Sequence, residues 1–232
     1  MRGLPSKSVH CFVCDLPYGQ LCETSVPWDV KLELKEFWTE VKRLAASDNS
    51  PVIMFCNTKF GFELYNSNPS WFRYDLVWNK ERGTTFLLAN KMPMKSHEMI
   101  YVFSKKGAFY RRVDIPGEYA SWSAHERPAT TRVVATWSGS NIAKGNDGTT
   151  RTPLSVITVR KPNTLGHPTE KPVELYRWIL ERYCPEGGVV LDPTAGSFNA
   201  IIAAKQLGLR GIGIEKNPDY FHQAIQRFWN QQ

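Results

Sequence analysis

The sequence contains no apolar run that approaches the roughly 18 to 20 residues of a membrane span. Its N-terminus, MRGLPSKSVH, also lacks the apolar centre of a signal peptide. We therefore expect a cytoplasmic protein with no membrane contact. The 232 residues are 42% hydrophobic and 22% charged. This composition is typical of a globular chain that is long enough to bury a sizeable core.

Cysteine is scarce, and its pattern excludes two classes of small domain. The five cysteines are odd in number and scattered, which argues against a disulfide framework. Cys11 and Cys14 stand in C-x-x-C spacing, but no second such pair or suitable Cys/His pair accompanies them. We predict no metal site. Because both cysteines lie inside an apolar run, we predict that they are buried strand residues.

The glycine motif G-x-G-x-x-G of dinucleotide-binding proteins is absent, and a different turn takes its place. In VVLDPTAGS an apolar strand ends in Asp192, and a turn containing Gly196 follows. A second strand ends in Glu215, an acid at the spacing that suits a ribose diol. The pattern favours an adenosyl ligand over a dinucleotide. An ordinary α/β turn with solvated acids is the alternative.

Apolar strands alternate with amphipathic helices, which predicts an α/β fold with a doubly wound, mostly parallel sheet. We expect strands over 9–15, 51–57, 72–78, 99–104, 189–192 and 211–215, and helices over 32–46, 62–66, 172–183, 199–208 and 219–229.

The positive charge is confined to one segment. Residues 105–161 contain ten basic and four acidic residues, which is +6 of the total net charge of +7. The surrounding stretch, 105–164, is rich in Gly, Ser, Thr, Asn and Pro, and it contains irregularly spaced aromatic residues. A loop of this length and charge indicates a functional segment with an anionic partner, although a solvated positive loop is the alternative.

A second acid also follows an apolar strand, in VCDLPYG. Together with other motifs in a fixed order, this segment resembles the β class of amino-methylating DNA methyltransferases, which act on adenine N6 or cytosine N4. The motifs, which span most of the chain, are Asp15-Leu16-Pro17-Tyr18, the stretch from Trp78 to Lys105, the basic segment, HPTEKP at 167–172 and LDPTAGS at 191–197.

The resemblance implies a Rossmann-like, S-adenosylmethionine-dependent methyltransferase fold with circularly permuted motif order. It assigns catalysis to Asp15, Leu16, Pro17 and Tyr18. The Asp15 carboxylate and the Leu16 carbonyl would accept the two N–H groups of the target amine and stabilise the developing positive charge. Tyr18 would stack on a base that has been flipped out of the duplex.

The cofactor implied by the resemblance is S-adenosylmethionine. Its assigned residues are Asp15, Thr169, Lys171, Asp192, Ala195, Gly196, Ser197 and Glu215. For Thr169 and Lys171, a helix cap ahead of Pro172 is the alternative role. Lys95, His97 and Glu98 are interpreted as structural or backbone-contacting.

The implied partner is double-stranded DNA, and a homodimer is left open. Residues 1–104 would form the catalytic half, 105–164 an inserted target-recognition segment and 165–232 the cofactor half of one domain. The predicted DNA-binding residues are Lys105, Lys106, Arg111, Arg112, Arg127, Arg132, Lys144 and Arg151.

The leading hypothesis is an adenine-N6 DNA methyltransferase, because aspartate opens the catalytic motif. Cytosine N4 is the alternative base, and RNA is not excluded as a substrate. A catalytically silent DNA-binding protein is the alternative from another class. Two departures from the family motivate it: Phe198 and Asn199 replace a glycine and a small hydroxyl residue, and no acidic stretch precedes Val9.

Overall fold

The computed structural model describes residues 1–19, 29–117, 149–161 and 170–230. The strands are β1 (Cys11–Cys14), β2 (Val52–Cys56), β3 (Phe72–Thr84), β4 (Lys95–Phe103), β5 (Ile115–Pro116), β6 (Thr150–Arg151), β7 (Val156–Thr158), β8 (Val189–Asp192) and β9 (Arg210–Gly213). The helices are α1 (Leu34–Leu44), α2 (Thr58–Ser67), α3 (Val173–Tyr183), α4 (Asn199–Gln206) and α5 (Pro218–Asn230), with short 3₁₀ turns η1 (Pro69–Trp71) and η2 (Phe86–Leu88).

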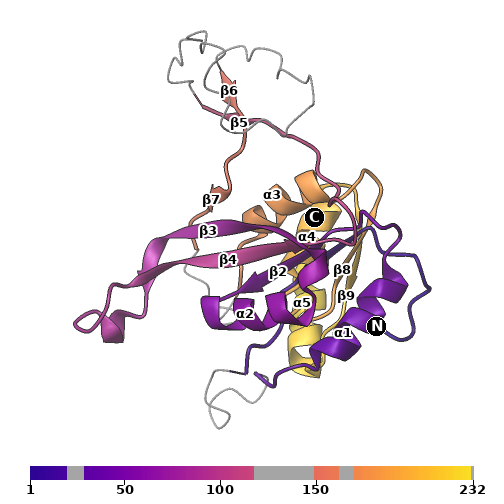
Figure 1. Ribbon diagram of the computed structural model, residues 1–232, viewed down its shortest axis with the longest axis horizontal. Helices are drawn as coiled ribbons and strands as arrows, with labels where there is room; N and C mark the ends of the chain where they lie inside the picture. The colour runs from indigo at the N-terminus through magenta and orange to yellow at the C-terminus, as the bar shows by residue number, and fades with distance from the viewer. Residues whose placement is uncertain (20–28, 118–148, 162–169, 231–232) are drawn as a thin grey trace. The chain divides into compact units, whose positions relative to one another are not determined.

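Within the described residues, seven strands form the main sheet, in the order β7-β3-β4-β2-β1-β8-β9 (Figure 1). All neighbouring pairs are parallel except the two that involve β4, so β4 alone runs against the others. β1 pairs with β8 although the two lie far apart in the chain. This pairing places the ends of two acid-terminated strands side by side.

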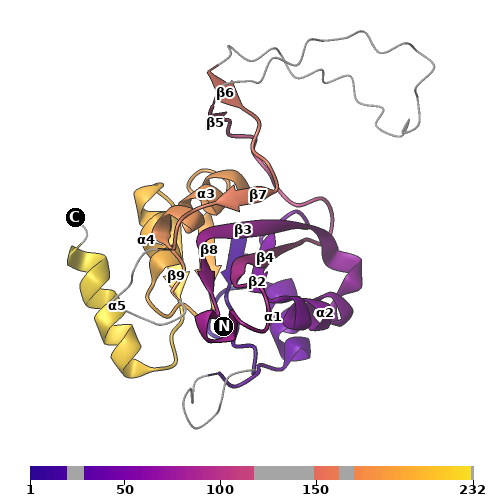
Figure 2. The same ribbon diagram turned by 90° about the vertical axis from the view of Figure 1, so that its left-hand side faces the viewer.

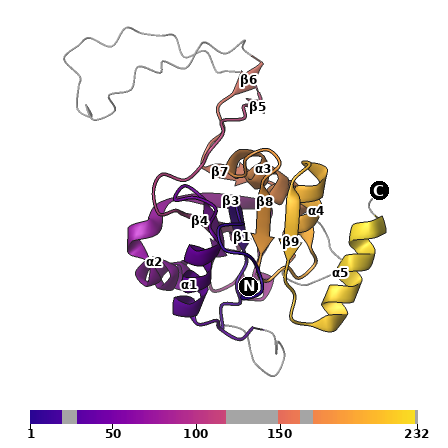
Figure 3. The ribbon, with the colours of Figure 1, turned by 90° about the vertical axis from the view of Figure 1, so that its right-hand side faces the viewer.

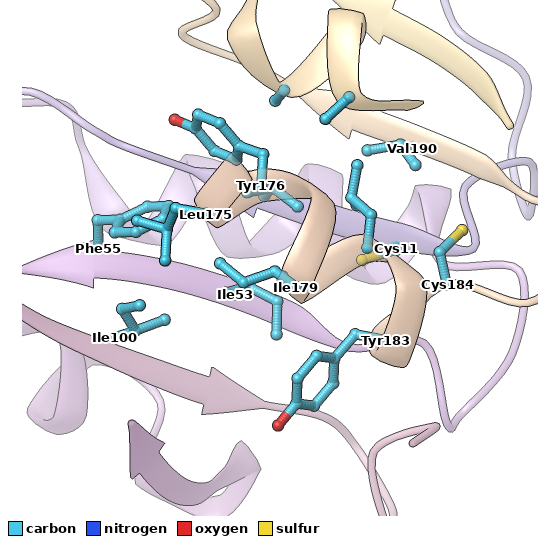
Figure 4. Close-up of a cluster of buried hydrophobic side chains, with 14 of the residues drawn as sticks. Cys11, Ile53, Phe55, Ile100, Leu175, Tyr176, Ile179, Tyr183, Cys184 and Val190 are labelled. Atoms are coloured by element: carbon cyan, nitrogen blue, oxygen red, sulfur yellow. The ribbon is translucent and has the colours of Figure 1, made fainter. Parts of the chain in front are cut away.

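Helices cover both faces of the sheet, as Figure 2 and Figure 3 show. Side chains alternate along a strand, and β1 follows this rule: Cys11 and Val13 pack on the α3 side, while Phe12 and Cys14 pack on the α1 side. Figure 4 shows the α3 side, where Leu175 and Ile179 lie among side chains from β1, β2 and β4. The predicted burial of both cysteines is confirmed.

The helix boundaries follow from local sequence. Asn57 caps α2, because its side chain accepts the Phe60 N–H at 2.9 Å. Pro172 stands immediately before α3, and Gly208, at φ +67°, lies one residue beyond the Leu207 C-cap of α4. A left-handed residue at this position is a common helix ending that favours glycine.

The predicted doubly wound, mostly parallel sheet is confirmed, with differences at its far edge. β3 and β4 are longer than expected, and β7 was not predicted. β7 adds to the edge of β3, and the Trp78 indole donates to the Val159 carbonyl at 2.8 Å. Three-residue strands carry too little periodic signal to be identified from sequence.

The described chain divides into two compact units. One comprises residues 1–111 with 155–232, and the other comprises residues 112–154. Within the second unit, β5 and β6 form a two-stranded antiparallel ladder. The aliphatic part of the Arg151 side chain lies against Gly117, which has a φ of +158°. Because Gly117 has no Cβ, the Arg151 side chain can approach its backbone closely.

Candidate active site

Asp15 follows β1 directly and lies where the carboxyl ends of the parallel strands meet. Both of its carboxylate oxygens have partners: Lys171 Nζ pairs with one, and the Tyr18 hydroxyl donates to the other at 3.1 Å. Burial raises the pKa of Asp15, although the neighbouring Lys171 opposes the shift. Each carboxylate oxygen has a second acceptor direction beyond the contact already made. The group can therefore accept a further N–H.

Lys171 lies between two carboxylates. Besides Asp15, its Nζ is 3.6 Å from Glu98 Oε2, and Lys80 Nζ is 2.5 Å from the other oxygen of Glu98. Burial acts to lower the pKa of Lys171, but Asp15 and Glu98 outweigh burial and raise it. Conversely, burial acts to raise the pKa of Glu98, while Lys171 and Lys80 lower it. The cluster thus keeps Lys171 and Glu98 charged.

Tyr18 and the turn that carries it are fixed from two sides. The Tyr18 ring stacks on Phe60 with centroids 4.8 Å apart. The Asp29 carboxylate accepts the N–H groups of Tyr18 at 2.8 Å and of Gly19 at 3.0 Å. Leu16, which stands between Asp15 and Tyr18 in the chain, is buried. This arrangement holds the Asp15–Tyr18 segment as a defined turn at the strand end.

The loop after β8 reaches across to Asp15. Thr194 Oγ1 donates to the Asp15 main-chain carbonyl at 3.0 Å, and the Thr194 N–H donates to Asp192 at 3.0 Å. Burial raises the pKa of Asp192 to about 7. One loop therefore contacts both strand-ending acids.

Glu215 closes this loop at its other end. One carboxylate oxygen accepts the Gly196 N–H at 2.8 Å, and the other accepts the Asn217 N–H at 2.8 Å. Gly196 has φ +48°, and a Cβ added there would meet no atom within 4 Å. Gly196 and Ser197 also line a hollow with Tyr220 and Arg227. The open side of the loop and the acids around it fit a cationic adenosyl cofactor.

Phe198 does not fill the open space beside Gly196. It is buried against α4 and α5, where its ring meets Phe221 edge-on with centroids 5.8 Å apart. The next residue, Asn199, donates to Glu170 at 2.6 Å and to the Lys171 carbonyl at 2.7 Å. Both replacing residues thus have structural roles, and Asn199 anchors the segment that carries Lys171.

The structure brings together most of the predicted site. Asp15, Tyr18 and Lys171 form one contact network, and the Asp192–Ser197 loop joins it through Thr194. Thr169 lies outside the described residues. Sequence reasoning missed Lys80, Asp29 and Thr194, and it gave Glu98 no place in the site, although the alternation along β4 offers a signal for this residue. Glu98 falls in register with the buried Ile100 and Val102, so a strand pattern places this acid on the covered face.

The predicted DNA-binding residues are dispersed. Lys105 and Lys106 follow β4, whose last residue pairs with the first residue of β2, so they lie at the end of the sheet opposite Asp15. Both pair with Asp48. Arg111 bonds Glu186 and the Glu181 carbonyl, and Arg112 pairs with Asp114. Arg151 lies in β6. Arg127, Arg132 and Lys144 lie outside the described residues.

Metal and membrane sites have no counterpart in the part of the chain that the structure describes. No group of three or more His, Cys, Asp or Glu residues there lies close enough to hold a metal ion. No helix in the same ranges is long and apolar enough to cross a membrane.

Comparison with known proteins places the chain in a family. A family model described as DNA methylase, of the N6/N4 type, matches residues 9–226. The Type II methyltransferase M.XycI of Xanthomonas campestris pv. cyanopsidis is 25% identical and aligns with 100% of this chain and 85% of its own length.

Two solved structures share the fold. The M1.HpyAVI–SAM complex has a TM-score of 0.62 at 21% identity and covers 95% of this chain and 89% of its own. The cytosine-N4-specific PvuII DNA methyltransferase has a TM-score of 0.66 at 14% identity and covers 98% and 82%. The chain belongs to the DNA methylase family of amino-methylating enzymes, which use S-adenosylmethionine as their methyl donor.

Proposed function

We propose that the protein methylates the N6 amine of adenine in double-stranded DNA. The observation that carries the proposal is the partly buried Asp15 at the end of β1, whose carboxylate pairs with Lys171 and whose main-chain carbonyl is bonded by Thr194 of the loop after β8. An aspartate at this position favours adenine in the family that the chain resembles. The cytosine-N4 specificity of the similar PvuII enzyme makes N4-methylation the second candidate.

The target amine would donate its two N–H groups to the Asp15 carboxylate and the Leu16 carbonyl. These acceptors favour a pyramidal nitrogen, whose lone pair is available for attack, and they stabilise the positive charge that develops on it. When S-adenosylmethionine is bound, it supplies the methyl group from its sulfonium. The methylated nitrogen then loses a proton, and Asp15 is placed to accept it because burial raises its pKa.

Lys171 and Glu98 would act on the reaction through Asp15. Lys171 pairs with Asp15, and Glu98 with Lys80 holds Lys171 from the opposite side. Partners of this kind limit the cost of burying a carboxylate. We therefore propose both as positioning residues.

Cofactor binding would rest on the loop after β8. Asp192, Ala195, Gly196 and Ser197 would hold the methionine end, and Glu215 would bind the ribose hydroxyls. Thr169 and Lys171 complete the proposed set. DNA would meet the target-recognition segment, 105–164, through the basic residues named above, and Lys105 and Lys106, which pair with Asp48, would contribute least.

The identity of the methylated base tests the proposal. The protein is incubated with tritiated S-adenosylmethionine and either genomic duplex DNA of mixed sequence or, in a parallel reaction, total RNA, and the digested nucleosides are separated. We expect label in N6-methyladenine. Label in N4-methylcytosine would overturn the choice of base, and labelled RNA without labelled DNA would overturn the choice of nucleic acid. An Asp15→Ala variant is the control for a contaminating methyltransferase.

A further inference from the structure

The β3–β4 hairpin exposes its large apolar side chains at its end. Leu87 is 94% and Phe86 is 78% exposed. We name the exposed apolar residues within 86–94 the apolar tip; they are Phe86, Leu87, Leu88, Met92 and Met94. Isolated exposed apolar side chains are common on proteins, but five of them within nine residues point to an interaction surface.

The apolar tip has a defined shape. Thr85 has a left-handed φ of +68° at the N-cap of η2, and its carbonyl accepts the Leu88 N–H at 2.9 Å. Across the hairpin, Thr84 Oγ1 donates to the Lys95 carbonyl at 2.9 Å. Gly83 packs so closely that an added Cβ would lie 2.8 Å from Met94 Cβ. A preorganised tip loses less conformational entropy when it binds a partner.

The hairpin extends from the end of the sheet at which Asp15 lies, where the parallel strands have their carboxyl ends. β4 runs antiparallel to β2 and pairs Met99 with Cys56, so the residues before Met99 lie beyond the carboxyl end of β2. The projection is visible in Figure 1. At its base, Glu98 reaches Lys171 of the active site. Thr84 stands six residues beyond Trp78, which separates the two by at most about 20 Å, because Glu81 at φ +55° interrupts the extended strand.

Charge selects the partner of the apolar tip. Residues 81–95 contain three basic residues, Arg82, Lys91 and Lys95, and one acid, Glu81, which gives a net charge of 3 − 1 = +2. Two such tips would repel each other, which argues against a second copy of the chain. A polyanion with apolar surfaces between its charges suits the combination, and the stacked bases of duplex DNA offer that surface.

We propose that the apolar tip is a wedge that enters the base stack of duplex DNA beside the base turned into the active site. The inference rests on the proposed function, because a base that leaves the stack exposes apolar base faces. Phe86 and Leu87, the most exposed members of the tip, would cover those faces. Arg82, Lys91 and Lys95 would meet the phosphates on either side.

The first experiment measures DNA unwinding and needs no methyl transfer. Closed circular plasmid is relaxed by a topoisomerase in the presence of the protein, and the change in linking number is read on a gel. We expect the wild type to unwind DNA and the double variant F86S/L87S to lose this effect. Asn90→Ala, a polar change within the hairpin, and Leu87→Met, which preserves an apolar side chain, should both unwind like the wild type. Equal unwinding by F86S/L87S and the wild type, or none by the wild type, would overturn the wedge.

The second experiment compares methyl transfer to genomic DNA before and after heat denaturation. We expect F86S/L87S to lose at least about tenfold on duplex DNA, equal to about 1.4 kcal/mol, and less than about twofold on denatured DNA. An equal loss on both substrates would overturn the wedge. If the wild type transfers no methyl group to either, the proposed function fails, whereas the unwinding result still decides the wedge.

The oligomeric state tests whether the apolar tip binds a second copy of the chain instead of DNA. Sedimentation of the wild type and F86S/L87S should give the same mass. A dimer that the substitutions dissociate would overturn DNA as the partner and assign the apolar tip to self-association.

Discussion

Asp15 and Asp192 end neighbouring strands of the same sheet, yet their environments differ. Asp15 directly follows β1 and Asp192 is the last residue of β8, and burial raises the pKa of both. Among the described residues, Lys171 forms an ion pair with Asp15, whereas Asp192 accepts the Thr194 N–H. The same local sequence pattern therefore produces two aspartates with different partners. The difference comes from a lysine that lies 156 positions further along the chain.

The largest expected effect comes from removing the acid that faces the target amine. Asp15→Ala should lower methyl transfer to DNA by at least about 10²- to 10³-fold, because it removes a group that stabilises charge in the transition state. Asp192→Asn should instead weaken the binding of S-adenosylmethionine more than it lowers the rate at saturation. Single-turnover methyl transfer and calorimetric titration of the cofactor measure the two quantities.

The contrast between the two acids is lost if both variants fail in the same way. Asp75→Asn, an exposed acid on β3, is the control and should leave both quantities unchanged. If Asp15→Ala retains methyl transfer and loses only cofactor affinity, then the assigned roles of the two acids are reversed.

The second prediction uses pH to sharpen the comparison. The folded-state pKa of Asp192 is about 7, above its ordinary value of 3.8. Its neutral form therefore contributes stability that is fully present below about pH 4 and is lost as pH rises through about 7. Asparagine stays neutral, so Asp192→Asn should gain stability relative to the wild type across this window, by up to about 4 kcal/mol. Urea unfolding at pH 5 and pH 8 measures the difference.

If the free energy of unfolding of Asp192→Asn differs from that of the wild type by the same amount at pH 5 and at pH 8, this prediction is contradicted. Asp75→Asn serves again as the control, since the same change of charge at an exposed position should show little dependence on pH.

The smallest expected effect is on the affinity for DNA, and it concerns Lys105 at the end of the sheet opposite Asp15. Lys105 pairs there with Asp48, so Lys105→Met should change the affinity for duplex DNA by less than about twofold. Arg151→Met, in the unit of residues 112–154, should reduce the slope of log affinity against log salt by about 0.9 if it removes one phosphate contact. Binding titrations at several salt concentrations distinguish the two variants. A larger slope change for Lys105→Met would place DNA at that end of the sheet.

The fold was predictable where one periodic signal dominated. β1, β2 and β8 are short apolar runs covered on both faces, and α3 places Leu175 and Ile179 on one buried face. β7 escaped prediction because its three residues gain their strand conformation from β3 and have little pattern of their own. Tertiary pairing, which a single sequence does not show, decides such segments.

The site was predictable in its motifs and less so in its contacts. Order along the chain pointed to Asp15, Lys171 and Gly196, but their partners depend on which strands lie side by side. Lys80 and Glu98 illustrate the limit. They stand on β3 and β4 and meet across the ladder. A charged residue in register with buried neighbours is the signal, and it identifies the face without identifying the partner.

The buried cysteines offer a built-in measure of how the protein opens. Cys11 and Cys184 pack on the α3 side of the sheet, and Cys14 and Cys56 on the α1 side. Burial raises the thiol pKa of Cys56 and of Cys184 to about 12, so neither forms an appreciable fraction of thiolate at neutral pH. Alkylation of these four thiols then requires exposure of the strand or helix end that carries them. The rate at which each pair is modified therefore reports the opening of one layer of the protein separately from the other.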